Sequence, residues 1–257
     1  MKVVILAGGF GTRLLEHTAV VPKPMVQIGQ QPILMHIFDT FIKYKFNEFI
    51  VAAGYKQDYI KNFFLNYAEL NSDFEIDYLK NKKTILSKKK INFKIKIMDT
   101  GLNTMTGGRV LRLKNFFKKN ENFILTYGDS LANVDIPKLV KFHKSHNKLV
   151  TITAVRPPAR FGLMDIDKTS NVKKFKEKVQ FKNGWINGGY MVINSNFFDY
   201  IENDSTFLEK EPLENVAKHN QLMAFKHEGF WHCMDTQRDK ENLENLLNHN
   251  HIPPWLI

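Results

Sequence analysis

The feature that most constrains the fold of this chain is a glycine-rich turn directly after a short apolar segment. Residues 2–5 read Lys-Val-Val-Ile and residues 6–13 read Leu-Ala-Gly-Gly-Phe-Gly-Thr-Arg. The apolar, β-branched run predicts a strand buried on both faces. The three glycines permit unusual backbone conformations and leave main-chain N–H groups accessible. Because such N–H groups form an anion site and Arg13 adds a charged fork, the turn predicts a phosphate-binding loop.

Other interpretations of this turn compete with that prediction. A dinucleotide-binding fingerprint would use Gly9 and Gly11, but Leu14 stands where its third glycine belongs. That fingerprint also expects an acid after the second strand, and residues 50–56 contain none. The spacing of a P-loop does not occur here. A tight turn with an exposed arginine remains the alternative.

Composition and length indicate one large folded domain. The chain has 257 residues, of which 43% are hydrophobic and 12% aromatic, enough for a substantial core. The sequence shows no apolar leader and no apolar run of membrane-spanning length, so we expect a cytoplasmic protein without a membrane partner. Its single cysteine, Cys233, excludes an internal disulfide and a cysteine-based zinc site.

The strong positive charge at first suggests a nucleic-acid partner. Formal net charge is +11, but eight of the lysines lie together between residues 80 and 96. Such a run is typical of a solvated hairpin or loop, and it could also attract polyanionic nucleotides. Since the chain has no recognisable zinc finger, helix-turn-helix or RNA-binding aromatic motif, we expect no nucleic-acid partner.

Predicted strands and helices alternate along most of the chain. Apolar patterning predicts strands at residues 3–7, 49–53, 93–98, 123–127 and 150–155, and helices near residues 33–41, 58–67, 106–117 and 136–144. In the second helix we expect a core-facing stripe of Tyr59, Ile60, Phe63, Phe64 and Tyr67. This order predicts an α/β fold, a Rossmann-like doubly wound and mostly parallel sheet. Ligands of such sheets bind beyond the carboxyl ends of the strands, where the glycine turn lies.

The pattern changes after residue 155. Two prolines follow Arg156, and residues 161–166 and 172–175 alternate like antiparallel strands. We therefore divide the single domain, residues 1–257, into a nucleotide-binding part at about residues 1–155 and a second part at about residues 156–257. The second part would contain a smaller β-rich sugar-binding lobe and the C-terminal elements.

Three charged residues are candidates for phosphate and metal binding. Lys23 lies between two prolines that stiffen its segment, so we expect it to contact phosphate and not to be a free surface lysine. Asp129 ends a predicted central strand, where it either caps a helix or binds Mg²⁺, with Gly128 leaving room for the ion. Asp235 either caps the C-terminal helix or supplies a second carboxylate to the same ion.

Two glycine pairs are candidates for contacts with the rest of a substrate. In Thr106-Gly107-Gly108-Arg109 the glycines would leave helix N-terminal amides bare, so Thr106 and these amides would meet a base or phosphate; a flexible loop is the alternative. Asn187, before Gly188 and Gly189, would bind a sugar hydroxyl or serve as an ordinary turn residue.

Taken together, these motifs resemble the signature of the sugar-1-phosphate nucleotidylyltransferases. The resemblance covers nearly the whole chain in the family's order. It is carried by residues 6–14 (LAGGFGTRL), 22–25 (PKPM), 106–109 (TGGR), 127–129 (YGD), 160–162 (RFG), 186–189 (INGG), 229–231 (GFW) and 234–236 (MDT).

The resemblance implies a reaction of CTP with α-D-glucose 1-phosphate that gives CDP-glucose and pyrophosphate, a step toward deoxysugars of bacterial surface polysaccharide. It implies Arg13, Lys23 and Asp129 as catalytic residues and Asp129 and Asp235 as ligands of Mg²⁺. Nucleotide contacts would come from Leu6, Ala7, Gly8, Gly9, Gly11, Thr12, Arg13, Lys23, Thr106, Arg109 and Gly128, with Thr106 and Arg109 on the cytosine and ribose side. Sugar-phosphate contacts would come from Lys178, Asn187, Gly188 and Gly189.

The resemblance also implies an assembly, because the lysine-rich segment is similar to one that reaches a neighbouring subunit. We expect a homo-oligomer, with a hexamer as the candidate state. Alternatives to the reaction are a different nucleoside triphosphate (dTTP, UTP or GTP), a different sugar 1-phosphate, or a non-catalytic nucleotide-sugar sensor. A Rossmann oxidoreductase is disfavoured by Leu14 and by the missing acid.

Overall fold

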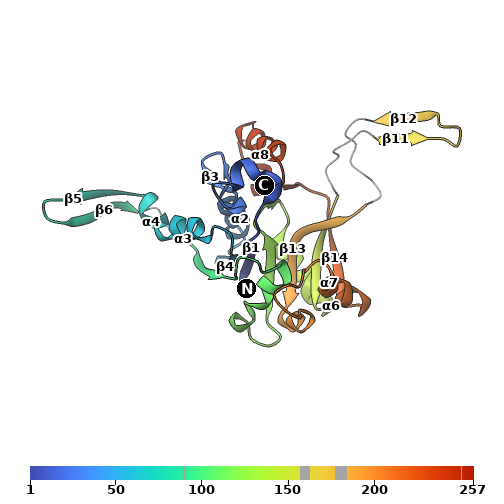
Figure 1. Cartoon of the computed structure of the whole chain (residues 1–257), viewed down its shortest axis with the longest axis horizontal. Coiled ribbons are helices and arrows are strands. Elements are labelled where there is room, and N and C mark those ends of the chain that lie inside the picture. Colours follow the sequence, from blue (N-terminus) through green and yellow to red (C-terminus); the bar gives the residue numbers. More distant parts are fainter. Residues whose placement is uncertain (89–90, 157–162, 177–183, 250) are drawn as a thin grey trace.

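The computed structural model describes residues 1–88, 91–156, 163–176, 184–249 and 251–257. Its centre is a seven-stranded sheet with the order β14-β10-β13-β8-β1-β4-β7 (Figure 1). These strands are β1 (Val3–Ala7), β4 (Glu48–Ala53), β7 (Lys94–Asp99), β8 (Asn122–Tyr127), β10 (Val150–Val155), β13 (Ile186–Asn194) and β14 (Leu222–His227). The helices are α1 (Leu15–Thr18), α2 (Ile33–Ile42), α3 (Gln57–Leu65), α4 (Tyr67–Leu70), α5 (Thr106–Leu111), α6 (Ile136–His146), α7 (Glu211–Lys218) and α8 (Gln237–His249).

Shorter elements complete the chain. The 3-10 helices are η1 (Thr12–Leu14), η2 (Lys23–Met25), η3 (Lys114–Phe116), η4 (Ser195–Tyr200) and η5 (Pro254–Leu256). The strands outside the main sheet are β2 (Gln27–Ile28), β3 (Gln31–Pro32), β5 (Ser72–Asp77), β6 (Lys82–Lys88), β9 (Ser130–Ala132), β11 (Leu163–Ile166), β12 (Val172–Lys176) and β15 (Trp231–Cys233). Among the described residues, no helix combines the length and the apolar character needed to cross a membrane.

All strands of the main sheet except β13 run in one direction. β8, β1, β4 and β7 pair in parallel, as do β10 and β14, whereas β13 is antiparallel to both β8 and β10. The predicted α/β fold with a mostly parallel sheet is confirmed. β13 and β14 show that residues after 155 also contribute to this sheet.

Strand β1 lies in the middle of the sheet and divides the core in two. Val3, Ile5 and Ala7 pack on the face covered by α2, α6 and α8, whereas Val4 and Leu6 pack on the face covered by α5, η4 and α7. All its residues are buried, which confirms the prediction of a strand without an exposed face. Burial on both sides fixes the position at which the glycine turn leaves the sheet.

The helix predicted at residues 58–67 is observed as α3 and the start of α4, and its predicted pattern holds only in part. Ile60 is fully buried, and Phe63, Phe64 and Tyr67 pack against the core from partly buried positions. Tyr59 is 47% exposed, so its predicted place in the core stripe is wrong. Neighbouring helical residues point about 100° apart around the axis, and with Ile60 inward Tyr59 is turned toward solvent.

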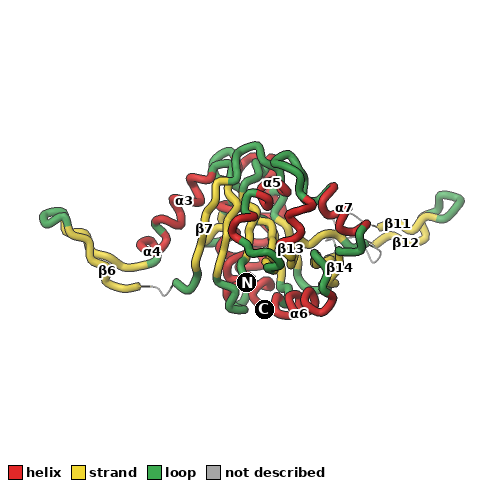
Figure 2. The backbone as a smooth tube through the Cα atoms, turned by 90° about the horizontal axis from the view of Figure 1, so that it is seen from below, coloured by secondary structure: helices red, strands yellow, loops and turns green. Residues whose placement is uncertain are grey.

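Two hairpins project from opposite ends of the molecule (Figure 1). The β5–β6 hairpin extends beyond α3 and α4 and carries part of the lysine-rich segment, as Figure 2 shows from another direction. This confirms the prediction of a solvated hairpin for that part of the segment. The β11–β12 hairpin matches the antiparallel strands predicted after residue 160.

The buried His143 gives stability a dependence on pH. Its ring lies within hydrogen-bond distance of the Thr151 hydroxyl, and burial together with His146 lowers the pKa of His143 to about 4. The unfolded chain, with an ordinary histidine pKa of 6.5, takes up the proton first as pH falls. The free energy of unfolding should therefore decrease by about 3 kcal/mol between pH 6.5 and 4 through this group. Urea unfolding of wild type and His143→Gln across this range should show a shallower decrease for the variant; equal slopes would contradict the assignment.

Candidate functional site

A cavity of about 340 Å³ lies at the carboxyl ends of β1 and β8. It gathers most of the residues that the sequence singled out, namely Leu6, Ala7, Gly8, Gly9, Gly11, Thr12, Arg13, Lys23, Thr106, Arg109, Gly128 and Asp129. Its other lining residues are Phe10, Pro24, Leu102, Asn103, Thr104, Met105, Tyr127 and Phe207. The segments that meet here are far apart in the sequence, and the parallel sheet brings them to one edge.

The glycines of the turn serve different purposes. Gly11 has a φ of +66°, which favours glycine, and it directly precedes η1, the short helix that carries Arg13. Gly9 faces open space, since no described atom lies within 4 Å of the position a Cβ would take. Gly8 is needed for packing, because a Cβ there would collide with the Arg109 guanidinium.

Arg109 lines the cavity and is only 4% exposed. Its guanidinium donates to the Gly8 carbonyl at 2.9 Å and to the Gly101 carbonyl at 2.7 Å. It also donates to the Thr100 hydroxyl at 2.8 Å. Arg109 thus links the glycine turn to residues 100–102 through hydrogen bonds.

Lys23 joins the two carboxylates that the sequence proposed as a pair. Its Nζ lies 2.6 Å from Asp129 Oδ2 and 2.7 Å from Asp235 Oδ1, and the residue is 8% exposed. Arg13 Nη1 is 2.7 Å from the other oxygen of Asp235. Burial alone would lower the pKa of Lys23 and raise that of Asp235. The opposite charges outweigh burial, so the pKa of Lys23 is raised and that of Asp235 lowered.

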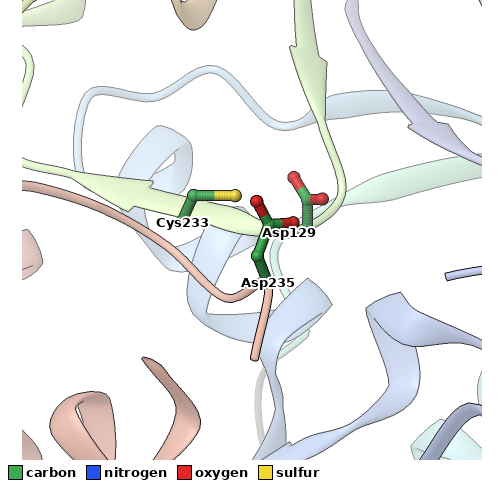
Figure 3. Close-up of side chains that lie close together, drawn as sticks. All are labelled: Asp129, Cys233 and Asp235. Atoms are coloured by element: carbon green, nitrogen blue, oxygen red, sulfur yellow. The ribbon is translucent and has the colours of Figure 1, made fainter. Parts of the chain in front are cut away.

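The same two carboxylates suit a hard divalent cation. Donor atoms of Asp129, Cys233 and Asp235 lie within 4.8 Å of one another, and Figure 3 shows the Cys233 side chain pointing toward both acids. Burial, and secondarily the Asp129 charge, raises the pKa of the Cys233 thiol, so it stays protonated. The available donors are therefore carboxylate oxygens, and one or two carboxylates plus phosphate oxygens and water form a common Mg²⁺ environment.

Neither acid caps a helix. Thr236 and Asp239 cap α8 reciprocally: the Thr236 hydroxyl accepts from the Asp239 N–H at 3.2 Å, and Asp239 accepts from the Thr236 N–H at 2.9 Å. Asp129 is followed by strand β9, and Asp135 caps the next helix, α6. The capping alternatives for Asp129 and Asp235 are wrong, and both carboxylates instead face Lys23.

The prediction that Gly107 and Gly108 leave bare amides is wrong. Both N–H groups donate to the Thr206 carbonyl, at 3.0 and 3.3 Å. A Cβ on Gly108 would lie 2.5 Å from the Asp204 Cα, and one on Gly107 would lie 2.7 Å from the Thr206 oxygen. The glycine pair therefore lets residues 203–210, which we call the capping loop, lie directly against the start of α5.

The capping loop also reaches the cavity. Phe207 lines it, and Glu209 accepts hydrogen bonds from the Thr106 hydroxyl at 2.7 Å and the Tyr127 hydroxyl at 2.6 Å. Burial, and then the Glu209 charge, raises the pKa of Tyr127. Sequence reasoning missed this loop, because its polar residues show no periodicity and no motif.

The residues expected to contact the sugar phosphate include Asn187, Gly188 and Gly189, and Gly189 packs against the Tyr127 ring. A Cβ on Gly189 would be 2.7 Å from the Tyr127 ring, and Gly189 has a φ of +84°. Asn187 accepts from the Gly189 N–H at 2.8 Å, and Gly188 packs on Val155, where β13 and β10 change register. The glycine pair forms part of this irregular pairing, outside the cavity lining.

Two further expectations concern Gly128 and Lys178. A Cβ on Gly128 would meet the Leu6 carbonyl oxygen at 2.9 Å and Pro24 Cγ at 3.0 Å. Gly128 thus makes room for the first strand and for Pro24, where we expected it to leave room for the ion. Lys178 lies outside the described residues.

The fold and the site define a nucleotidyltransferase. The family model described as "Nucleotidyl transferase" matches residues 2–237, and the chain belongs to this family. It is 45% identical over 253 residues to glucose-1-phosphate cytidylyltransferase of Salmonella typhimurium, covering 98% of each chain. It is 37% identical over 249 residues to a probable glucose-1-phosphate cytidylyltransferase of Bacillus subtilis, covering 96% of each. The crystal structure of HddC from Yersinia pseudotuberculosis has the same fold, with a TM-score of 0.68, 24% identity and coverage of 95% of this chain and 98% of that one.

Alanine substitutions can distinguish the packing role of Gly108 from the open position of Gly9. Gly108→Ala should lower the free energy of unfolding by roughly 1–3 kcal/mol, because the new methyl group meets the backbone of the capping loop. Gly9→Ala should leave stability unchanged and weaken nucleotide binding, because the methyl group enters the open cavity. Urea unfolding and equilibrium nucleotide binding of both variants measure these effects. A stable Gly108→Ala protein would show that the loop is not held as described.

Proposed function

We propose that this protein transfers a cytidylyl group from CTP to α-D-glucose 1-phosphate and releases pyrophosphate and CDP-glucose. The observation that carries the proposal is the meeting of Arg13, Lys23, Asp129 and Asp235 beside a glycine-lined cavity. Two relatives at 45% and 37% identity, named for this activity, support the choice of substrates. Such a reaction belongs in the cytoplasm, where CTP is available.

The charges along the cavity suggest how CTP lies in it. The triphosphate would occupy the end formed by Arg13 and Lys23, with the open Gly9 and its neighbours facing the phosphates. The nucleoside would extend toward Thr106 and residues 102–105 at the other wall. We assign contacts with the sugar phosphate to residues 187–189 and Lys178. With this assignment, the nucleotide is bound mainly by residues before 155 and the sugar phosphate by residues after it.

Asp129 and Asp235 would hold Mg²⁺, which supplies positive charge against the phosphate oxygens when it is bound. In the reaction, a phosphate oxygen of glucose 1-phosphate attacks the α-phosphorus of CTP. A new P–O bond forms while the bond to pyrophosphate breaks, and pyrophosphate leaves with the electron pair. Arg13 and Lys23 would align the phosphates and neutralise their charge, which is most of what such a transfer requires. The protonated Cys233 thiol is unsuited to act as a nucleophile.

We further propose that the chain forms a homo-oligomer through the β5–β6 hairpin, with a hexamer as the candidate state. Between its strands, Tyr78 is 85% exposed and Leu79 98% exposed. Large apolar side chains gathered at the end of a projecting arm favour burial against another copy of the chain. Light scattering of wild type and of Tyr78→Ser/Leu79→Ser would test this, and an unchanged mass would contradict the role of the arm.

Pyrophosphate release across four nucleoside triphosphates and a panel of sugar 1-phosphates, with and without Mg²⁺, tests the proposed reaction. CTP with glucose 1-phosphate should give the highest kcat/KM, and omission of Mg²⁺ should abolish turnover. A higher kcat/KM with dTTP, UTP or GTP would favour the related transferases. Binding of CTP without any pyrophosphate release would favour a nucleotide-sugar sensor, which the presence of both acids argues against.

Asp129→Ala should reduce kcat by orders of magnitude while the protein stays folded, because the variant loses a carboxylate at the metal and phosphate site. Asp199→Ala is a matched control, since that aspartate is 73% exposed and pairs only with Lys114 among the described residues. Circular dichroism and steady-state kinetics in Mg²⁺ measure the two properties. Near-normal turnover of Asp129→Ala would remove Asp129 from the metal site.

A further inference from the structure

The Thr106 hydroxyl is held between two partners at the wall of the cavity. It donates to Glu209 Oε2 at 2.7 Å and accepts from the Leu208 N–H at 2.9 Å. A hydroxyl has one proton and two lone pairs, whereas a carboxylate can only accept. The proton must therefore point to Glu209, and the Leu208 N–H occupies one lone pair. What Thr106 can offer a ligand is the second lone pair, so it presents an acceptor and no donor.

Glu209 is an exposed residue whose carboxylate is held by two hydrogen bonds. Its other oxygen accepts from the Tyr127 hydroxyl at 2.6 Å, so both oxygens are engaged by residues that line the cavity. The capping loop that carries Glu209 is fastened to α5 through main-chain hydrogen bonds, and Asp204 forms an ion pair with Arg112 at 2.5 Å. Turning the Thr106 proton away would give up a hydrogen bond to a charged carboxylate, which is stronger than one between neutral groups.

Thr106 lies where the base of a bound nucleotide is expected. Of the cations that line the cavity, Arg13 and Lys23 lie beside the glycine turn, and the Arg109 guanidinium is engaged by protein oxygens, whereas Thr106 with residues 102–105 forms the other wall. Cytosine carries an amino donor at the position where uracil and thymine carry a carbonyl acceptor. A Thr106 hydroxyl that can only accept would form a hydrogen bond with the amino group of cytosine. The carbonyl of uracil or thymine would instead face a lone pair of that hydroxyl and form no hydrogen bond with it.

We propose that Glu209 is a positioning residue for base selection: by fixing the direction of the Thr106 hydroxyl, it favours cytosine over uracil and thymine. This inference rests on the proposed function only for the orientation of the nucleotide. It assigns selectivity to a pair of residues from distant parts of the chain, one at the start of α5 and one in the capping loop. Glu209 acts through Thr106 and does not itself line the cavity.

Glu209→Gln tests the proposal. With Tyr127 still donating to the amide oxygen, the Gln amide N–H₂ faces Thr106 and can donate to it, which frees the hydroxyl proton to turn into the cavity. The ratio of kcat/KM for CTP over UTP should then fall at least tenfold, mainly through KM.

The ratio of the dissociation constants of CTP and UTP, measured without a sugar phosphate, should change by the same factor. Loss of affinity for CTP and UTP by one common factor would show a merely structural role and overturn the proposal.

Two further variants keep the result interpretable. Thr106→Val removes the acceptor at nearly constant shape and should lower the CTP preference; adding Glu209→Gln to it should then leave the ratio unchanged. Asp204→Asn weakens the attachment of the same loop and should leave the ratio at the wild-type value. A wild-type enzyme that turns over UTP better than CTP would refute the proposed function alone, because the binding ratio still reports whether Glu209 controls the base.

Discussion

The sharing of one ammonium group by two carboxylates is the interaction on which the site depends. Asp129 follows β8 and Asp235 follows β15, and without a cation between them the acids would repel each other. Lys23 reaches both from the first position of η2, directly after Pro22. Because the three groups are largely buried, loss of one partner leaves uncompensated charge inside the protein. The cluster therefore fixes three distant segments at the edge of the sheet.

The capping loop adds a second constraint on the same cavity. It has no strand or helix of its own between η4 and α7, yet it closes the start of α5 and contributes Phe207 to the cavity wall. Its contact depends on two glycines whose missing side chains leave space for its backbone. The wall opposite the phosphate end is thus built from two segments about 100 residues apart, of which the loop has little regular structure.

Much of this was accessible from the sequence, and the exceptions have physical reasons. The glycine turn and the central strands follow from local patterns, and the place of Asp129 beside the turn follows from the rule that parallel strands end at one edge. Asp235 was proposed as the second acid of the same site, and the antiparallel pairing of β15 with β9 brings it there. The purposes of Gly8, Gly108 and Gly128 did not follow, because each glycine accommodates a group that is distant in the sequence. Glu209 was missed for the same reason, since its partners become neighbours only through folding.

The reversed direction of β13 determines where the connection from β10 to β13 lies. β10 ends and β13 begins at the same edge of the sheet, so the chain between them, residues 156–185, leaves and returns on the side of the cavity. The connection therefore starts and finishes outside the core. Insertions or deletions between β10 and β13 can therefore be accommodated without shifting the register of either strand, so this connection can change in length while the sheet stays as it is.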